Sequence, residues 1–139
     1  MSFAPHPDLV KDGFVLAESD QYLLNIVNDS RYLWLILIPK VEGARDTFDL
    51  TEASQIQLTL LSNRIGQTIS EEFNGDKFNV ASLGNMVPQL HIHLIVRHVG
   101  DAAWPGPIWG VGEAHPYTEE QLNSVITRLA AVVDMIEEV

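Results

Sequence analysis

The apolar run at residues 33–38, Leu-Trp-Leu-Ile-Leu-Ile, constrains the fold of this chain more than any other segment. Its residues are apolar without alternation, which is typical of a strand covered on both faces. Pro39 closes the run. Even with this proline, the run is far shorter than the roughly 20 residues that a membrane-spanning helix needs. We therefore expect a buried strand inside a layered fold.

The segments around this strand indicate the rest of the architecture. β-rich or alternating patterns predict four further strands, at residues 14–17, 22–27, 77–82 and 90–98. Apolar residues at helical spacing predict a long helix from Ala53 to Phe73, capped by Asp49 or Thr51. The order of elements predicts the α+β class, with an antiparallel sheet of about five strands and one long helix packed on it.

Three regions complete this outline. Thr118 and Gln121 form a capping-box pattern, which predicts a C-terminal helix with one apolar stripe that runs to Ile136. Residues 100–117 are rich in glycine and proline, and we expect a structured loop there. Residues 1–13 are interpreted as a loosely held lead-in.

Composition narrows the possible partners. The 139 residues suit a single domain, 1–139. Eight Lys and Arg against 19 Asp and Glu give a net charge of −11, which disfavours nucleic acid polymers and anionic membranes. The absence of cysteine excludes disulfides, thiolate metal sites and cysteine nucleophiles. The N-terminus lacks an apolar core of signal-peptide length, so we expect a soluble, cytoplasmic protein.

The most informative segment is residues 89–97, Gln-Leu-His-Ile-His-Leu-Ile-Val-Arg. Because alternate strand residues share a face, Gln89, His91, His93 and Arg97 are predicted to lie on one face and apolar residues on the other. Histidine donors and an arginine can surround the oxygens of an anion such as phosphate. A neutral histidine is also a nucleophile near neutral pH, provided that an acceptor such as a backbone carbonyl holds its Nδ1–H.

Two other interpretations of the histidine pair stay open. His-x-His on a strand can simply be a polar, solvent-facing pair. It can also chelate a metal ion, although a catalytic zinc usually has three protein ligands and no third ligand has a spacing signal here. Trp34 and Trp109 are interpreted as packing residues, and Trp104 as the better candidate for contact with a base or a partner subunit.

Residues 89–95 resemble the signature of the histidine triad (HIT) family of nucleotide hydrolases and transferases, with glutamine in place of the first histidine. The resemblance extends to the Gly-Asn lead-in at residues 84–85 and to the strand that ends at Pro39. Arg97 and the Gly-Asp at residues 100–101 are similar to the dinucleoside-polyphosphate branch, and the Trp-Pro at residues 104–105 is similar to the phosphoramidase branch.

The resemblance implies a role for each matching residue. His91 would be the nucleophile that attacks the α-phosphorus of a nucleotide, and His93 would hydrogen-bond the phosphate. Gln89 would orient the nucleophile through its backbone carbonyl, but its side chain cannot titrate to protonate a leaving group. Asn85 would contact the phosphate or the bridging group, and Asn28 would bind ribose hydroxyls. Arg97 would complete the nucleotide-binding set, beside its ordinary interpretation as a strand-end cation.

The sequence therefore predicts a hydrolase of nucleoside phosphoramidates or dinucleoside polyphosphates that works through a nucleotidyl-histidine intermediate. The resemblance also implies a homodimer, a small-molecule nucleotide substrate, and a covalent step that needs no metal or other cofactor. One alternative is a nucleotide-binding module that turns over little because Gln89 replaces a histidine. Another is a His-x-His metal-binding protein.

Overall fold

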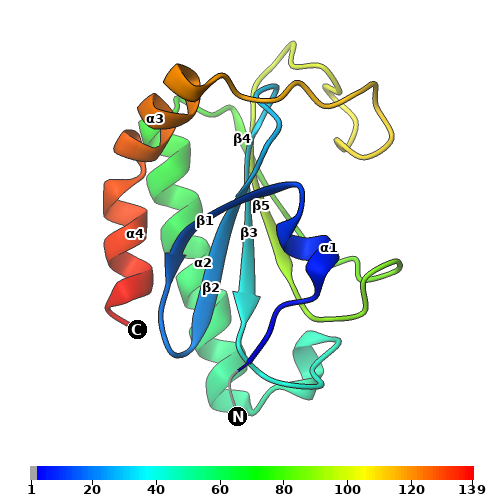
Figure 1. The fold of residues 1–139 in the computed structure, drawn as a ribbon, viewed down its shortest axis with the longest axis vertical. Coiled ribbons are helices and arrows are strands. Elements are labelled where there is room, and N and C mark those ends of the chain that lie inside the picture. The colour runs from blue at the N-terminus through cyan, green and yellow to red at the C-terminus, as the bar shows by residue number, and fades with distance from the viewer. Residues whose placement is uncertain (1–2) are drawn as a thin grey trace.

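The computed structural model describes residues 3–139, and it contains a five-stranded antiparallel sheet. Its strands are β1 (Gly13–Glu18), β2 (Tyr22–Val27), β3 (Leu33–Pro39), β4 (Lys77–Ala81) and β5 (Ile92–Arg97). They lie in the order β1-β2-β3-β5-β4, so β3 is central and β1 and β4 are the edges (Figure 1). The predicted α+β fold with an antiparallel five-stranded sheet is confirmed.

The long helix α2 (Glu52–Glu72) packs on one face of the sheet (Figure 1). The Thr51 hydroxyl caps it by accepting a hydrogen bond from the Ser54 N–H, which selects one of the two predicted capping residues. Its buried stripe includes Leu61, Ile65 and Ile69, which recur at helical spacing.

The C-terminal segment forms two helices where one was predicted. They are α3 (Glu119–Arg128), which starts with the expected capping box, and α4 (Ala130–Glu137). The break is at Leu129, whose backbone angles of φ −96° and ψ 10° lie outside the helical region. Its N–H donates to the Ile126 carbonyl three residues back, which tightens the last turn of α3.

The central strand β3 is buried on both faces, as its continuous apolar run predicts. Its residues Leu33, Leu35 and Leu37 belong to the large core beneath α2 and α4. Ile36 and Ile38 point to the opposite face, where they pack with Leu9 from the N-terminal segment. In β5 the alternation is equally clear, because Leu94 and its apolar neighbours join the helix-side core and the histidines face the other way.

The first described residues are not the loose lead-in that the sequence suggests. They contain a short helix, α1 (Pro7–Val10), which lies over the sheet face opposite α2 (Figure 1). Leu9 is only 7% exposed because it packs into the apolar cluster on that face. Proline and glycine content predicts the absence of long regular elements here, but not the tertiary contacts that hold the segment.

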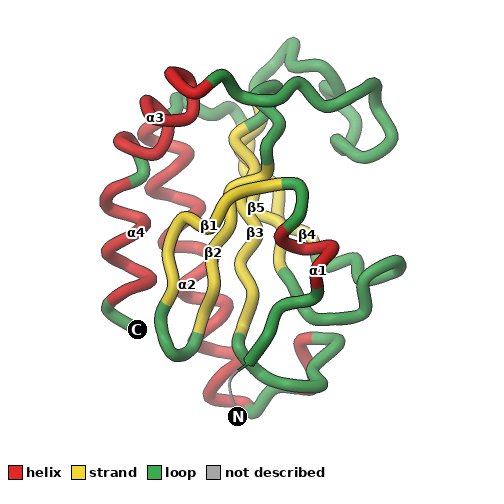
Figure 2. The backbone as a smooth tube through the Cα atoms, viewed as in Figure 1, coloured by secondary structure: helices red, strands yellow, loops and turns green. Residues whose placement is uncertain are grey.

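Two long loops flank β5, at residues 82–91 and 98–118 (Figure 2). The strand itself begins at Ile92, two residues later than predicted, because the Leu90 N–H donates to the Ala44 carbonyl outside the sheet ladder. His91 therefore lies just before the strand. Within residues 3–139, none of the helices has the length and apolar character needed to cross a membrane.

Candidate active site

His91 is oriented by the backbone of Gln89. Its Nδ1 lies 2.7 Å from the Gln89 carbonyl oxygen. Because a carbonyl can only accept a hydrogen bond, Nδ1 carries the proton and donates it. A neutral imidazole has one N–H, so Nε2 holds a free lone pair. The ring is thus prepared to act as a nucleophile or a base through Nε2.

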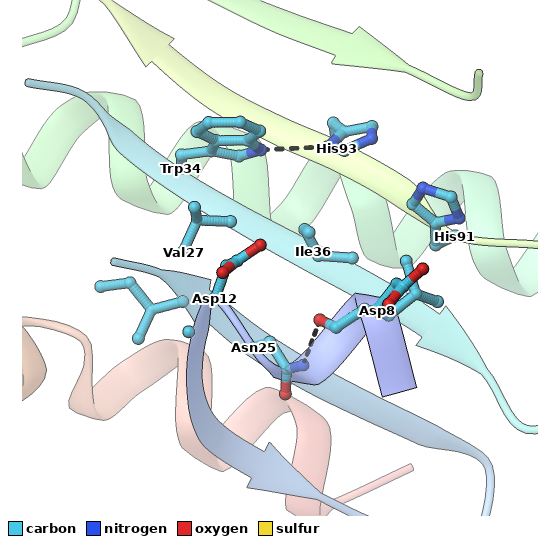
Figure 3. Close-up of a pocket in the computed structure, with 11 residues that line it drawn as sticks. Asp8, Asp12, Asn25, Val27, Trp34, Ile36, His91 and His93 are labelled. Atoms are coloured by element: carbon cyan, nitrogen blue, oxygen red, sulfur yellow. Dashed lines mark hydrogen bonds between the residues drawn. The ribbon is translucent and has the colours of Figure 1, made fainter. Parts of the chain in front are cut away.

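His93 is held in the opposite tautomer by Trp34. The indole Nε1–H of Trp34 donates to Nδ1 of His93 over 3.0 Å (Figure 3). Because indole nitrogen is a donor only, Nδ1 of His93 is the acceptor and its proton resides on Nε2. The two imidazole rings lie 4.9 Å apart at 73°. The site therefore presents one acceptor, from His91, beside one donor, from His93.

Burial keeps His93 neutral. The side chain is 6% exposed, and desolvation, followed by the charge of His91, lowers the pKa of His93 from 6.5 to about 4. At neutral pH the ring therefore keeps the single-proton form that its bond to Trp34 requires. Such a neutral donor can bind a phosphate oxygen without a change in its own protonation state.

The histidines line a cavity of about 170 Å³ between the sheet and α1 (Figure 3). Asp8, Leu9 and Asp12 form its α1 side, and the side chains of β2 and β3 form its floor. His91 is 6% exposed but adjoins this cavity, so it is not sealed beneath apolar side chains. Among the described residues that line the cavity there is no lysine or arginine.

A second cavity, of about 440 Å³, adjoins the first. The two share Asp12, Gly13, Val27 and Trp34. Small-molecule sites typically measure about 300–1,000 Å³, so the first cavity alone is small for a nucleotide and the pair is sufficient. The second cavity is where Asn28 lies. Its side-chain oxygen accepts a hydrogen bond from the Tyr117 N–H at 2.9 Å, which leaves its amide nitrogen as the group that can reach a ligand.

The other predicted site residues lie away from the histidine cavity. Asn85 is exposed in the loop before β5 and lines neither cavity. The side chain of Gln89 points to the N-terminal segment, where its oxygen accepts from the His6 N–H at 2.7 Å. Only the backbone carbonyl of Gln89 contacts His91.

Arg97 is occupied by protein partners. It is 1% exposed, and its guanidinium donates to both carboxylate oxygens of Asp101, at 2.7 and 2.8 Å, and to Asn79 at 3.0 Å. The hydrogen bonds from Arg97 lower the pKa of Asp101 to about 2. The guanidinium also lies 5.6 Å from the Trp104 ring. Arg97 therefore binds the loop that follows β5, and Trp104 lies in that loop against the guanidinium.

Trp34 does more than pack, whereas Trp109 packs against the histidine site as predicted. Besides the bond from Trp34, the Trp109 ring meets the His93 ring edge-on, with centroids 5.0 Å apart at 78°. The interpretation of Trp34 as a packing residue is therefore incomplete. The pairing of β3 with β5 places Trp34 opposite Ile95 and Ile36 opposite His93, and this register brings the indole to the histidine. No local pattern in the sequence identifies that register.

The histidine pair has few free ligand atoms for a metal ion. Nδ1 of His91 and Nδ1 of His93 are both engaged in hydrogen bonds, so only the two Nε2 atoms could serve as ligands. Across the part of the chain that the structure describes, no group of three or more His, Asp or Glu side chains is placed to hold a metal. The arrangement can bind an anion through the His93 Nε2–H and place it beside the His91 Nε2 lone pair, which can act as a nucleophile or a base.

Comparisons with known proteins show which family and which solved structures this chain is similar to. The model of the HIT domain family matches residues 8–100. A histidine triad protein from Marinobacter aquaeolei VT8 is 43% identical, with a TM-score of 0.93 over 98% of this chain and 99% of that one. A histidine triad protein from Bradyrhizobium japonicum is 34% identical, with a TM-score of 0.91 over 96% and 99%. A third, from Sinorhizobium meliloti 1021, is 35% identical, with a TM-score of 0.89 over 93% and 96%. No curated protein matches the chain.

Proposed function

Because the chain belongs to the histidine triad family, whose members include nucleotide hydrolases and transferases, we propose that it hydrolyses nucleotide conjugates at the α-phosphorus. The observation that carries this proposal is the opposed pair of tautomers. His91 has a free lone pair on Nε2, and His93 has a proton on Nε2, at the same cavity. Nucleotidyl transfer needs a nucleophile beside a group that donates a hydrogen bond to the phosphate.

The proposed reaction has two steps. His91 Nε2 attacks the α-phosphorus, a phosphorus–nitrogen bond forms, and the bond to the leaving group breaks with its electron pair. The leaving group takes up a proton from solvent, and His93 Nε2–H donates to a phosphate oxygen throughout. Water then attacks the phosphorus and gives up a proton to solvent, the bond to His91 breaks with its electron pair returning to Nε2, and a nucleoside monophosphate is released. Splitting one difficult displacement into two easier ones is the advantage of covalent catalysis.

The charges around the cavity favour one class of leaving group. Asp8 and Asp12 line it; Lys11, at the second cavity, pairs with Asp8 at 3.4 Å, so among the described residues Asp12 is the lining carboxylate that forms no ion pair. Carboxylates repel the additional phosphates of a dinucleoside polyphosphate and tolerate a neutral or cationic amine. We therefore infer a preference for nucleoside phosphoramidates within the proposed function, with Asn28 in the second cavity as the candidate ribose contact.

One observation favours a second candidate, a nucleotide-binding module with little turnover. The Gln89 side chain is bound to the N-terminal segment and has no titratable proton for the leaving group. Proton delivery to a leaving group typically accelerates such reactions by about 10²–10⁴-fold. If no other group supplies that proton, the protein would bind nucleotides and cleave them slowly.

Incubation with adenosine 5′-phosphoramidate and with a diadenosine polyphosphate, each with and without chelator, separates these functions. Chelator-insensitive release of AMP, together with a mass increase of one adenylyl group on the protein during turnover, would support the covalent hydrolase. AMP binding without turnover would identify the binding module. Chelator-sensitive turnover would contradict both and favour the metal-binding alternative.

We also propose that the protein is a homodimer assembled through the β4 edge and α2. β4 is an edge strand, and unpaired edges are usually protected or paired in native proteins. Val80 on β4 is 52% exposed, and Ile56 and Leu60, which share a face of α2, are more than half exposed. An edge strand and a helix face that both expose apolar residues are features of a subunit interface.

A further inference from the structure

We propose that Gln89 is a positioning residue whose side chain fixes residues 4–12 as a wall of the nucleotide site. This segment is called the N-terminal wall below. The inference rests on the proposed function for the identity of the ligand. It assigns a role to the Gln89 side chain itself, which binds a separate segment of the chain.

The Gln89 side chain is joined to the N-terminal wall at both ends of its amide group. Its Oε1 accepts from the His6 N–H at 2.7 Å, and its Nε2 donates to the Ala4 carbonyl at 3.4 Å. Helix α1 begins at Pro7, directly after His6. The glutamine therefore holds the chain at the point from which the helix enters the site.

Two further contacts hold the rest of the N-terminal wall. The Leu9 carbonyl accepts a hydrogen bond from the Asn25 amide at 3.2 Å, and the Asp12 carbonyl accepts from the Asn28 N–H at 2.8 Å. Both donors belong to β2 or the turn that follows it. Gln89 differs from them because it lies two residues before His91, on the segment that leads into β5, and so connects the wall to the other side of the cavity.

One residue thus sets the positions of two opposing parts of the site. The backbone carbonyl of Gln89 accepts the Nδ1–H of His91, while its side chain holds the His6 backbone. The N-terminal wall in turn places Asp8 and Asp12 at the cavity, with the Asp8 side of α1 across from His91 (Figure 3). Of the three side-chain or backbone anchors of the wall, Gln89 is the one that also orients the nucleophile.

Loss of the Gln89 side chain is expected to weaken substrate binding more than it slows chemistry. A released wall spends part of its time away from the cavity, and apparent affinity falls by the fraction that remains competent. One hydrogen bond of this kind corresponds to a rise in KM of about 3- to 10-fold. The change in kcat should be smaller than the change in KM, because the Gln89 carbonyl and His91 remain in place.

The test compares Gln89→Met, which keeps the shape but removes both hydrogen bonds, with Gln89→Glu, which keeps the oxygen that accepts from His6. The probe is adenosine 5′-phosphoramidate, and amide hydrogen exchange of residues 6–12 is measured in the free protein. Gln89→Met should raise KM and accelerate exchange, and Gln89→Glu should restore protection of the His6 amide. Gln21→Met, in the exposed turn between β1 and β2, is the matched control and should change neither quantity.

A double-mutant cycle tests whether Gln89 acts through His6. His6→Pro removes the N–H at a backbone angle of φ −58° that proline accepts, and His6→Ala controls for the lost imidazole cap. In the His6→Pro background, Gln89→Met should have little further effect on KM. Additive effects, or a lower kcat at unchanged KM and unchanged exchange, would overturn the inference and assign Gln89 to the chemistry.

Failure of the proposed function would look different. In that case the parent protein would neither bind AMP nor cleave the phosphoramidate, whatever residue stands at position 89. Hydrogen exchange alone would then test whether the Gln89 side chain holds the N-terminal wall. Unchanged exchange of residues 6–12 in Gln89→Met would overturn it, and faster exchange would support it.

Discussion

The indole Nε1–H of Trp34 donates a hydrogen bond of 3.0 Å to Nδ1 of His93, and the two residues are 59 positions apart in the chain. This contact decides which nitrogen of His93 carries the proton. The Gln89 carbonyl fixes the opposite tautomer of His91, with the proton on Nδ1. The chemical asymmetry of the histidine pair therefore comes from two neighbours that each have only one hydrogen-bonding role.

Trp34→Phe should lower kcat for a nucleoside phosphoramidate by roughly 10-fold, because it leaves the buried Nδ1 of His93 without its donor. The aromatic packing is largely retained. Imidazole nitrogen NMR should show His93 losing its single tautomer. Trp109→Phe is the matched control, since Trp109 contacts the same ring edge-on. An equal loss in both variants would mean that packing matters and the hydrogen bond does not.

His91→Ala should reduce turnover by roughly 10³-fold or more, because it removes the attacking atom. The protein should stay folded, since the side chain lies beside a cavity and not in the helix-side core. Steady-state kinetics and intact mass of a trapped adenylyl adduct measure the effect, with thermal unfolding as the check on folding. Turnover at the parental rate would disprove covalent catalysis at His91.

Stability should fall on acidification from pH 7 to pH 5 by about 2 kcal/mol through His93 alone. The pKa of His93 is about 4 in the folded protein against an ordinary 6.5, so between these values the unfolded chain binds the additional proton. Acid therefore favours unfolding in this window, and below pH 4 this group adds nothing more. Denaturant titrations at pH 7 and pH 5 measure the difference. His93→Gln should remove most of it; an unaltered pH dependence would contradict the assignment.

Arg97→Lys should destabilise the protein by about 1–2 kcal/mol while changing KM less than 2-fold. Lysine keeps the charge but lacks the planar guanidinium that donates two parallel hydrogen bonds to Asp101 and a third to Asn79 in the buried pair. Arg128→Lys, at a half-exposed pair with Glu72, is the comparison and should cost little. A large rise in KM without loss of stability would instead indicate that Arg97 contacts the nucleotide.

Val80→Arg should convert the proposed dimer to a monomer of 15.5 kDa in sedimentation at micromolar concentration, because it places a charge on the β4 edge. Val15→Arg changes an equally exposed valine on β1, the opposite edge of the sheet, and should leave the dimer intact. A parent protein that sediments as a monomer would contradict the dimer itself.

Local patterns in the sequence determined much of the fold and the orientation of the histidines. The unbroken apolar run of β3 indicates a strand buried on both faces, and the alternation around His91 and His93 indicates that they share a face away from the core. Both predictions depend only on the two-residue period of a strand, which each segment carries within itself. The capping residues of α2 and α3 are equally local.

What only the tertiary structure decided are the partners of those histidines. No pattern within β3 or β5 indicates the register that brings Trp34 to His93. Equally, no local pattern indicates that the His6 backbone contacts Gln89, 83 positions away in the chain. The same is true of Arg97, which shares the histidine strand but is bound by Asp101 in the following loop. Periodicity specifies the face on which a side chain lies, whereas its contacts depend on which distant segment packs there, and that is determined by burial and hydrogen bonding of the whole chain at once.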